Sequence, residues 1–162
     1  MSLHYKHFEV TGHPKSTYTF VVTENSWHVY LLCSSSDLRT CYIYNDAISL
    51  EKTYKSKYKN MMRVLGQNCE SGKPLNIFYN DKECHPILTI KIDGNEEKIW
   101  RIRQGELRLC FVYLPPKKRL ILLRLFVKND DTLKKKEKSS LKLLAEQVIT
   151  DNTQTFALRI IP

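Results

Sequence analysis

The sequence lacks any long apolar run, and no window reaches the roughly 18 consecutive apolar residues that a membrane-spanning helix needs. Its first residues, Met-Ser-Leu-His-Tyr-Lys-His, also lack the apolar core of a signal peptide. Neither an internal repeat nor a low-complexity tract is present. We therefore expect no membrane contact and no collagen-like or coiled-coil structure. At 162 residues the chain suits one domain with an appendage, and a large multi-domain enzyme is excluded.

The chain also lacks the cysteine pattern of a disulfide framework or a zinc site. None of its five cysteines stands in a C-x-x-C pair, and an odd number leaves one without a partner. The five histidines show no ligand spacing with these cysteines. We therefore expect reduced thiols, a cytoplasmic protein, no metal site and no cofactor.

Positive charge is concentrated in one part of the chain. Residues 98–142 hold 14 basic and 4 acidic residues, whereas residues 1–46, 47–97 and 143–162 each lie within one charge of neutrality. Nearly all of the net charge of +9 therefore lies in this 45-residue stretch. Such a concentration favours a polyanionic partner, either a nucleic acid or an acidic protein, although a solubilising surface would also carry many charges.

The first 46 residues predict a small β appendage. The β-forming stretch Thr17 to Thr23 and the strand Trp27 to Cys33 flank a turn, so they form a hairpin candidate. Thr40 to Tyr44 is a third, shorter strand candidate.

A helix, a run of strands and a second helix are predicted to follow. Asn45 and Asp46 are suitable N-cap residues, and Gly66 is placed for the C-terminal cap. Between them, apolar residues recur at helical spacing at Leu50, Tyr54, Tyr58, Met61, Met62 and Leu65. The strands expected next are Ile87 to Asp93, Ile99 to Arg103, Leu107 to Leu114 and Leu120 to Lys128.

Short connections between these strands predict an antiparallel meander, with Asp93-Gly94 as a hairpin turn. The second helix is predicted over Leu133 to Ile149, capped by the stretch Asn129 to Thr132. The predicted fold is α+β, with the main domain over residues 47–150 and a tail over 151–162. In that tail Phe156 to Ile161 could form an edge strand.

The sequences of these elements, in this order, resemble those of the RelE/HigB-type bacterial toxin superfamily, and most nearly its phage-derived Gp49-like branch. The segments that carry the resemblance are G-K-P-L at residues 72–75, I-W-R-I-R at 99–103, G-E-L-R-L-C-F-V-Y at 105–113, L-L-R-L-F-V-K at 122–128 and D-T-L-K-K-K-E at 131–137. It covers roughly residues 48–149 and rests on the order and spacing of these motifs together.

The resemblance implies a compact α+β fold whose antiparallel sheet is backed by helices on one face. It also implies a toxin of a toxin–antitoxin system, a ribosome-dependent mRNA endonuclease in which a ribose 2′-OH attacks the adjacent phosphate without a metal. The implied partners are mRNA on the ribosome and a cognate antitoxin protein. Basic side chains can assist this reaction because charge develops on the phosphoryl oxygens.

Strand periodicity indicates which basic residues could act together. Alternate side chains share a face, so Arg101 and Arg103 share one face, and Arg124 and Lys128 share a face with Leu122. Arg108 lies opposite the apolar positions of its own strand. If the register aligns them, four or five cations line one surface, and arginine suits phosphate because it binds bidentately. Basic residues on a wet strand face are the alternative explanation.

The resemblance assigns roles to some of these residues. In the family, one strand reads G-x-Y-R and a later strand ends in G-F-V-K-K. Arg108 matches the arginine of the first of these, and Arg101 and Arg103 match basic positions on the strand before it. Lys128 matches the basic residue that follows the valine in the second. We therefore expect these four to be catalytic. Further RNA-binding residues are expected at Arg124, Lys134, Lys135 and Lys136.

Two departures concern the family's other catalytic groups. Leu107 stands where the family has an aromatic residue. No C-terminal tyrosine or histidine matches the stacking or acid groups of some members, and Tyr79, His85 and Tyr113 are the possible substitutes. The alternative interpretation is that the protein is a non-catalytic RNA- or protein-binding module with a toxin-like fold. A third interpretation is a toxin whose site is covered by its own chain.

Overall fold

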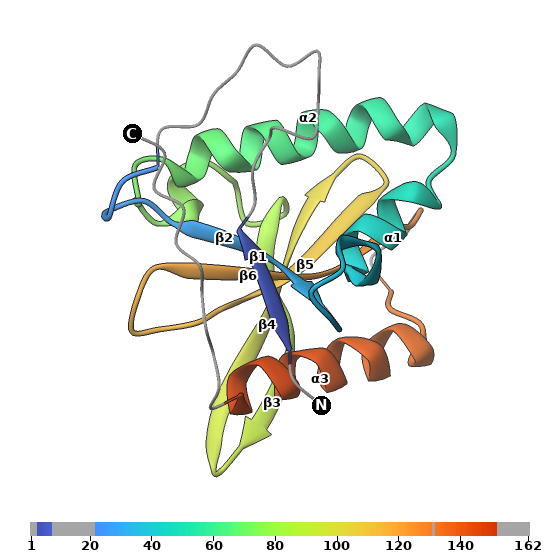
Figure 1. Ribbon diagram of the computed structural model, residues 1–162. Helices are drawn as coiled ribbons and strands as arrows, with labels where there is room; N and C mark the ends of the chain where they lie inside the picture. Colours follow the sequence, from blue (N-terminus) through green and yellow to red (C-terminus); the bar gives the residue numbers. More distant parts are fainter. Residues whose placement is uncertain (1–2, 8–21, 131, 152–162) are drawn as a thin grey trace.

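A computed structural model describes residues 3–7, 22–130 and 132–151, which form a mixed six-stranded sheet and three α-helices (Figure 1). The strands follow the spatial order β1-β2-β6-β5-β4-β3. Their bounds are β1 His4–His7, β2 His28–Cys33, β3 Cys84–Ile92, β4 Asn95–Gln104, β5 Leu107–Tyr113 and β6 Arg119–Val127. All neighbouring strands are antiparallel except β2 and β6, which run parallel. The predicted α+β class is confirmed.

Strands β3 to β6 form a consecutive antiparallel meander. β5 pairs antiparallel with both β4 and β6, as the sequence predicts. The turn between β3 and β4 has positive φ at Asp93 (50°) and at Gly94 (82°). Positive φ at both central residues is what the tight hairpin turn predicted from Asp-Gly requires.

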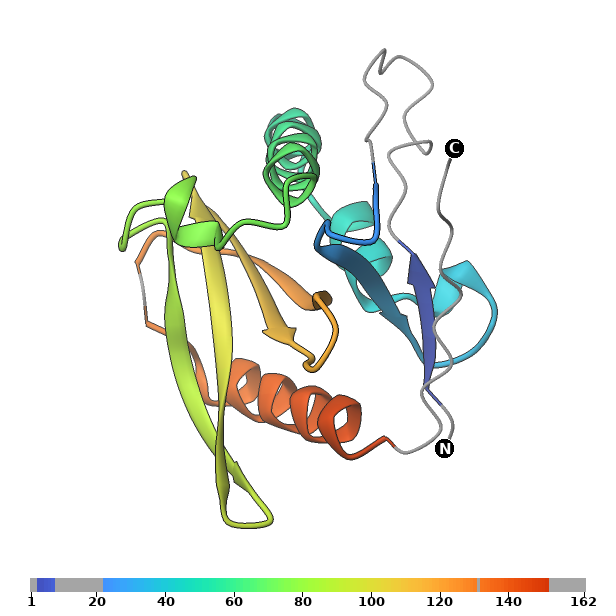
Figure 2. The ribbon, with the colours of Figure 1, turned by 90° about the vertical axis from the view of Figure 1, so that its left-hand side faces the viewer.

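Helices cover both faces of the sheet, with α2 (Lys52–Cys69) on one side and α3 (Lys135–Thr150) on the other (Figure 2). The expectation of helices on one face only is therefore wrong. The physical reason lies in the strands, since six of the seven residues of β5 are buried. A strand with apolar side chains on both faces needs a cover on each.

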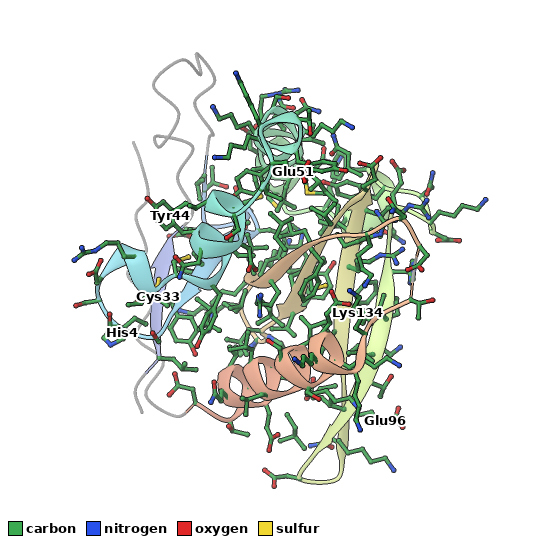
Figure 3. All side chains as sticks on the ribbon, turned by 90° about the vertical axis from the view of Figure 1, so that its right-hand side faces the viewer. His4, Cys33, Tyr44, Glu51, Glu96 and Lys134 are labelled. Atoms are coloured by element: carbon green, nitrogen blue, oxygen red, sulfur yellow. The ribbon has the colours of Figure 1, made fainter. Side chains whose placement is uncertain are left out.

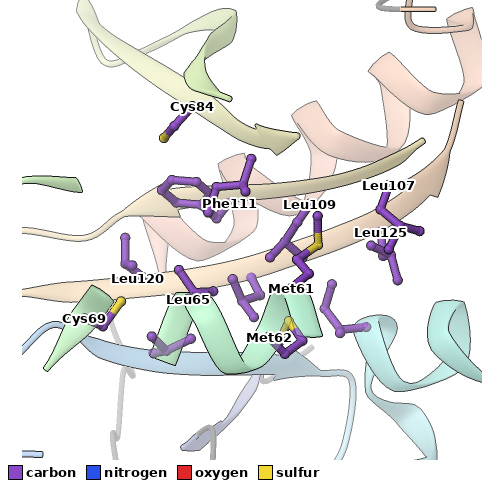
Figure 4. Packing of buried hydrophobic residues seen from close by; sticks show 14 of the residues in the cluster. Met61, Met62, Leu65, Cys69, Cys84, Leu107, Leu109, Phe111, Leu120 and Leu125 are labelled. Carbon is purple, nitrogen blue, oxygen red and sulfur yellow. The ribbon is translucent and has the colours of Figure 1, made fainter. Parts of the chain in front are cut away.

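The face under α2 holds the larger apolar cluster (Figure 4). Met61, Met62 and Leu65 of α2 pack with Leu109 and Phe111 of β5, and all five are at most 1% exposed. Full burial of such side chains contributes roughly 1.5–3 kcal/mol each relative to exposure. The face under α3 holds a second cluster, built on Leu141, Leu144, Ala145 and Val148 of that helix.

Several predicted boundaries are wrong. Thr40 to Tyr44 does not form a strand, because Cys41 makes a single bridge and α1 (Tyr42–Ile48) begins directly after it. Asn45 and Asp46 consequently lie inside α1 instead of capping the long helix. Gly66 does not end α2 either, since it is buried within the helix, which continues to Cys69.

The N-terminal region contributes to the same sheet as the meander. The predicted strand Trp27 to Cys33 is confirmed as β2, which lies between β1 and β6. Most of its predicted hairpin partner, Thr17 to Thr23, lies outside the described residues, as does the tail stretch Phe156 to Ile161. None of the helices in the described ranges combines the length and the apolar character that spanning a membrane requires.

Candidate nucleic-acid interface

The register of the meander brings the predicted basic residues onto one face of the sheet. Arg103 lies directly opposite Arg108, while Cys110 lies between Arg101 on one side and Arg124 on the other. Lys128 follows β6 and bonds to Glu137 of α3. We call this set the strand cation cluster; it consists of Arg101, Arg103, Arg108, Arg124 and Lys128. Cys110 packs with the residues of α3, so the cluster lies on the face that α3 covers.

The two central arginines of the cluster are buried. Arg101 is 3% exposed and Arg108 is 2% exposed. Nη1 of Arg108 donates hydrogen bonds to the carbonyl oxygens of Gly105 and Leu107. The sequence suggested a solvent-exposed Arg108, and this expectation is wrong because α3 covers the middle of that sheet face. Arg103 is only partly buried.

Three residues could substitute for the stacking or acid groups of the family, and of these only His85 adjoins the cluster. Its Nε2 lies 2.9 Å from Nη2 of Arg101, and its Nδ1 lies 2.9 Å from the carbonyl oxygen of Pro86. A guanidinium can only donate and a carbonyl can only accept, so these contacts fit a neutral ring with the proton on Nδ1. Tyr79 and Tyr113 instead join the apolar cluster under α2, on the opposite face.

Arg124 binds a carboxylate that the sequence analysis did not assign to the site. Its Nε and Nη2 donate to the two oxygens of Asp46 in α1, at 2.8 and 2.9 Å. Nη1 donates to the hydroxyl of Ser140 in α3 at 3.0 Å. Arg124 therefore links both helices to β6, and this bidentate geometry is the one in which arginine binds carboxylate or phosphate.

Glu137 fixes the start of α3 against the cluster. Its Oε1 accepts hydrogen bonds from Nζ of Lys128 and from the backbone amide of Lys134, the latter at 2.8 Å. Burial alone would raise the pKa of Glu137, but the Lys128 ammonium and the Lys134 amide outweigh it and hold the pKa below its ordinary value. The helix begins at Lys135, so the predicted caps between Asn129 and Thr132 are wrong. In the sequence, Glu137 is detectable as the single acid within the lysine run of residues 134–138.

Exposed lysines lie at the start of α3, beside the covered cluster, and along α2 on the opposite face of the sheet. Three predicted RNA-binding residues are exposed at the start of α3: Lys134, Lys135 and Lys136. Figure 3 labels Lys134. On the other side of the sheet, α2 carries five basic residues and no acid. The basic residues are Lys52, Lys55, Lys57, Lys59 and Arg63. The net charge of residues 47–97 does not reveal this surface, because acidic residues elsewhere in that stretch balance its charge.

A cavity of about 330 Å³ opens beside the cluster at the end of β6. Tyr54 and Phe126 contribute aromatic rings to its lining, and Asp46, Glu51 and Glu137 contribute carboxylates. The guanidinium of Arg124 lies 5.3 Å from the centre of the Phe126 ring, within cation–π range. A cavity with aromatic rings and hydrogen-bond acceptors has groups that can stack on a nucleobase and accept from its amino groups.

Comparison of the chain with protein-family models, with curated proteins and with solved structures finds no match. Within the described part of the chain, no group of three or more His, Cys, Asp or Glu side chains could hold a metal ion. The side chains available for chemistry at this site are its cations, His85 and the neighbouring carboxylates.

Proposed function

We propose that the protein is a RelE/HigB-type toxin that cleaves mRNA on the ribosome, with the strand cation cluster as the site for the scissile phosphate. The observation that carries the proposal is the convergence of five cations, from β4, β5 and the end of β6, on one face of the sheet. Arginines in this number on adjacent strands suit a phosphate better than they suit a solvated surface, because a guanidinium binds two phosphoryl oxygens at once.

In the proposed reaction, the 2′-oxygen of a ribose attacks the adjacent phosphorus and the 5′-oxygen of the next nucleotide leaves. The products are a 2′,3′-cyclic phosphate and a 5′-hydroxyl, so no water or metal is consumed. Arg103, which is only partly buried, and Nη1 of Arg124, which would leave Ser140 when α3 moves, would stabilise the charge that develops on the phosphoryl oxygens. His85 has its Nε2 lone pair directed at Arg101 and could take the proton of the 2′-OH once RNA displaces that contact.

The proposal requires movement of the first turns of α3. The contacts between Lys128 and Glu137 and between Arg124 and Ser140 hold this segment over the cluster. The described conformation is then a covered form of the site, and RNA would replace these contacts with its own phosphates. An antitoxin would act from outside by placing acidic groups against the exposed lysines.

A second candidate is a non-catalytic RNA-binding module. The burial of Arg101 and Arg108 favours this candidate. A buried guanidinium that donates to carbonyl oxygens of the protein itself stabilises the fold and need not bind RNA. In this case the exposed lysines of α2 and α3 would bind RNA, and the covered cluster would stabilise the sheet.

Cleavage of a defined mRNA in a translation extract, mapped at the 5′ ends of the fragments, separates the two candidates. The wild type should cleave, and Arg103→Ala should lower the rate about 100-fold, the scale expected on removal of one preorganised donor. Lys117→Ala is the matched control, because Lys117 is exposed in the turn between β5 and β6, outside the cluster. Equal losses in both variants would reject a site at the cluster.

Binding to single-stranded RNA completes the comparison. The logarithm of the affinity should fall with that of salt concentration with a slope of roughly 0.7 per neutralised phosphate. Salt-dependent binding without cleavage supports the module. An absence of both cleavage and binding at low salt would reject both candidates and leave an acidic protein as the partner.

A further inference from the structure

We propose that Cys33 and Cys41 are a redox modification site, at which hydrogen peroxide converts two neighbouring thiols into a disulfide that ties the end of β2 to the start of α1. Both cysteines are reduced in the structure. The proposal concerns the scaffold beside the candidate site and does not depend on RNA binding or cleavage.

The backbone geometry places the two residues as cross-strand neighbours. Cys33 and Cys41 form an isolated antiparallel bridge. The adjacent backbone hydrogen bond runs from the amide of Ser34 to the carbonyl of Thr40, at 3.3 Å. That bond flanks the cysteine pair, so the cysteines occupy a non-hydrogen-bonded position, where the Cα atoms lie about 4.5 Å apart and the side chains are close. Disulfides need Cα separations of roughly 4.4–6.8 Å, so the bridge can form with little movement of the backbone.

The surroundings of Cys41 favour its thiolate. A hydrogen bond with Cys33 lowers the pKa of Cys41 to about 7; burial opposes this shift, and the amides of Tyr44 and Ile43 add to it. The amide nitrogen of Tyr44 lies 3.5 Å from Sγ of Cys41. Figure 3 places Cys33 below Tyr44, where β2 ends beside α1.

The remaining three cysteines lack these features. Burial raises the pKa of the Cys84 thiol to about 11 and that of Cys110 to about 12, and it also raises the pKa of Cys69. A protonated thiol is a poor nucleophile. Cys41 should therefore react before these three.

The proposed reaction balances with peroxide as the oxidant. The Cys41 thiolate attacks one oxygen of hydrogen peroxide, which breaks the O–O bond and gives a sulfenic acid and, after protonation, one water. The Cys33 sulfur then attacks the sulfenic sulfur and releases a second water. Overall, two thiols and one peroxide give one disulfide and two waters.

The structure predicts that the slow step of the oxidation is the access of hydrogen peroxide to the buried cysteine pair. Cys33 is 3% exposed and Cys41 is 0% exposed. The segment between them, residues 34–40, is largely exposed and ordered by contacts of Asp37 and Thr40. Peroxide should therefore reach Cys41 when this segment opens. A low concentration of urea that leaves the protein folded should accelerate the reaction.

Peptide mapping tests the proposal directly. Folded protein is treated with hydrogen peroxide, remaining thiols are alkylated in denaturant, and the chain is cut with trypsin. Cleavage after Arg39 separates the two cysteines, so their disulfide appears as a linked pair of peptides that reductant separates. We expect this pair as the main oxidation product, with an increase in the urea midpoint of unfolding.

Two variants complete the experiment. Cys33→Ser should leave Cys41 as a sulfenic acid that dimedone traps, whereas Cys110→Ser should still form the linked pair. A linked pair that forms no faster than random pairs with Cys69, Cys84 or Cys110 would overturn the proposal. Full alkylation of Cys33 and Cys41 after peroxide treatment of the folded wild type would overturn it as well.

Discussion

Asp46 of α1 forms a bidentate ion pair with Arg124 of β6, and the same carboxylate completes the open edge of that strand. Its carboxylate accepts from Nε and Nη2 of Arg124, and Oδ2 also accepts from the amide of Leu125 at 2.9 Å. β2 pairs with β6 only as far as Leu122. Beyond that residue no strand supplies acceptors for the β6 edge within the described residues, so the side chain of Asp46 takes the place of a neighbouring backbone.

Asp46→Asn should destabilise the fold strongly. The amide removes the negative charge beside a partly buried guanidinium and weakens three hydrogen bonds at once. We expect a loss of about 1–3 kcal/mol, between the values for exposed and for buried ion pairs, because the side chains of Arg124 and Asp46 are 27% and 14% exposed. Urea unfolding at neutral pH measures it.

Asp37→Asn is the matched control for the Asp46 variant. Asp37 also pairs with an arginine, Arg39, but both side chains are exposed, at 44% and 83%. Exposed pairs are screened by water, so the urea midpoint of this variant should stay at the wild-type value. A similar drop in both variants would contradict the role given to the β6 edge.

Arg108→Ala should lower stability before any effect on activity is considered. The side chain is buried, and its removal leaves a void and the carbonyl of Gly105 without this donor. We expect a loss of about 2–4 kcal/mol, in the range for large-to-small changes in a core. Arg103→Ala, at a partly exposed position on the opposing strand, should cost less than half as much in the same thermal and urea unfolding series.

The sequence predicted the strands of the meander and the shared face of its cations, because alternation and short turns determine both. It did not predict burial, which depends on where α3 packs. It also did not predict the β-bulge in β6. Leu122 was expected on the same face as Arg124, but the bulge opposite Cys110 and Phe111 places Leu122 in the apolar cluster under α2. The partners Asp46 and Glu137 come from distant elements, and single-sequence patterns carry little information on such contacts.

Glu137 should make the free energy of unfolding depend on pH in the acidic range. Its pKa lies below the ordinary value of 4.5 in the folded protein, so the unfolded chain takes up protons first as pH falls. The stabilisation is complete above about pH 5 and disappears as the pH drops through the folded pKa. Glu137→Gln should cost about 1–3 kcal/mol at pH 7, the scale of a charged hydrogen bond, and little at pH 3.

Urea midpoints measured between pH 3 and pH 7 test this difference. The wild-type and Glu137→Gln curves should converge toward acid. Parallel curves would mean that Glu137 acts only through packing. Glu24→Gln, at an exposed position in the turn before β2, is the control in the same pH series.

Gly72 is the position at which the loop after α2 approaches the segment before β2 most closely. Its φ is +68°, and a Cβ there would lie 1.7 Å from the carbonyl oxygen of Asn25. The same loop is fixed by bonds from Lys118 Nζ to the Gly72 oxygen at 2.7 Å and from Trp27 Nε1 to the Lys73 oxygen at 2.8 Å. A methyl group would therefore add a backbone clash to the strain of positive φ.

Gly72→Ala should destabilise by about 3 kcal/mol or more, because neither the backbone of Asn25 nor the φ of residue 72 can relax without breaking these bonds. Gly94→Ala separates the two causes. Gly94 also has a positive φ, +82°, but its Cβ would meet nothing within 4 Å, so only the conformational strain of about 1 kcal/mol remains. Thermal and urea unfolding of both variants measure the difference. Equal losses would show that the contact with Asn25 yields easily and that strain alone determines the cost at Gly72.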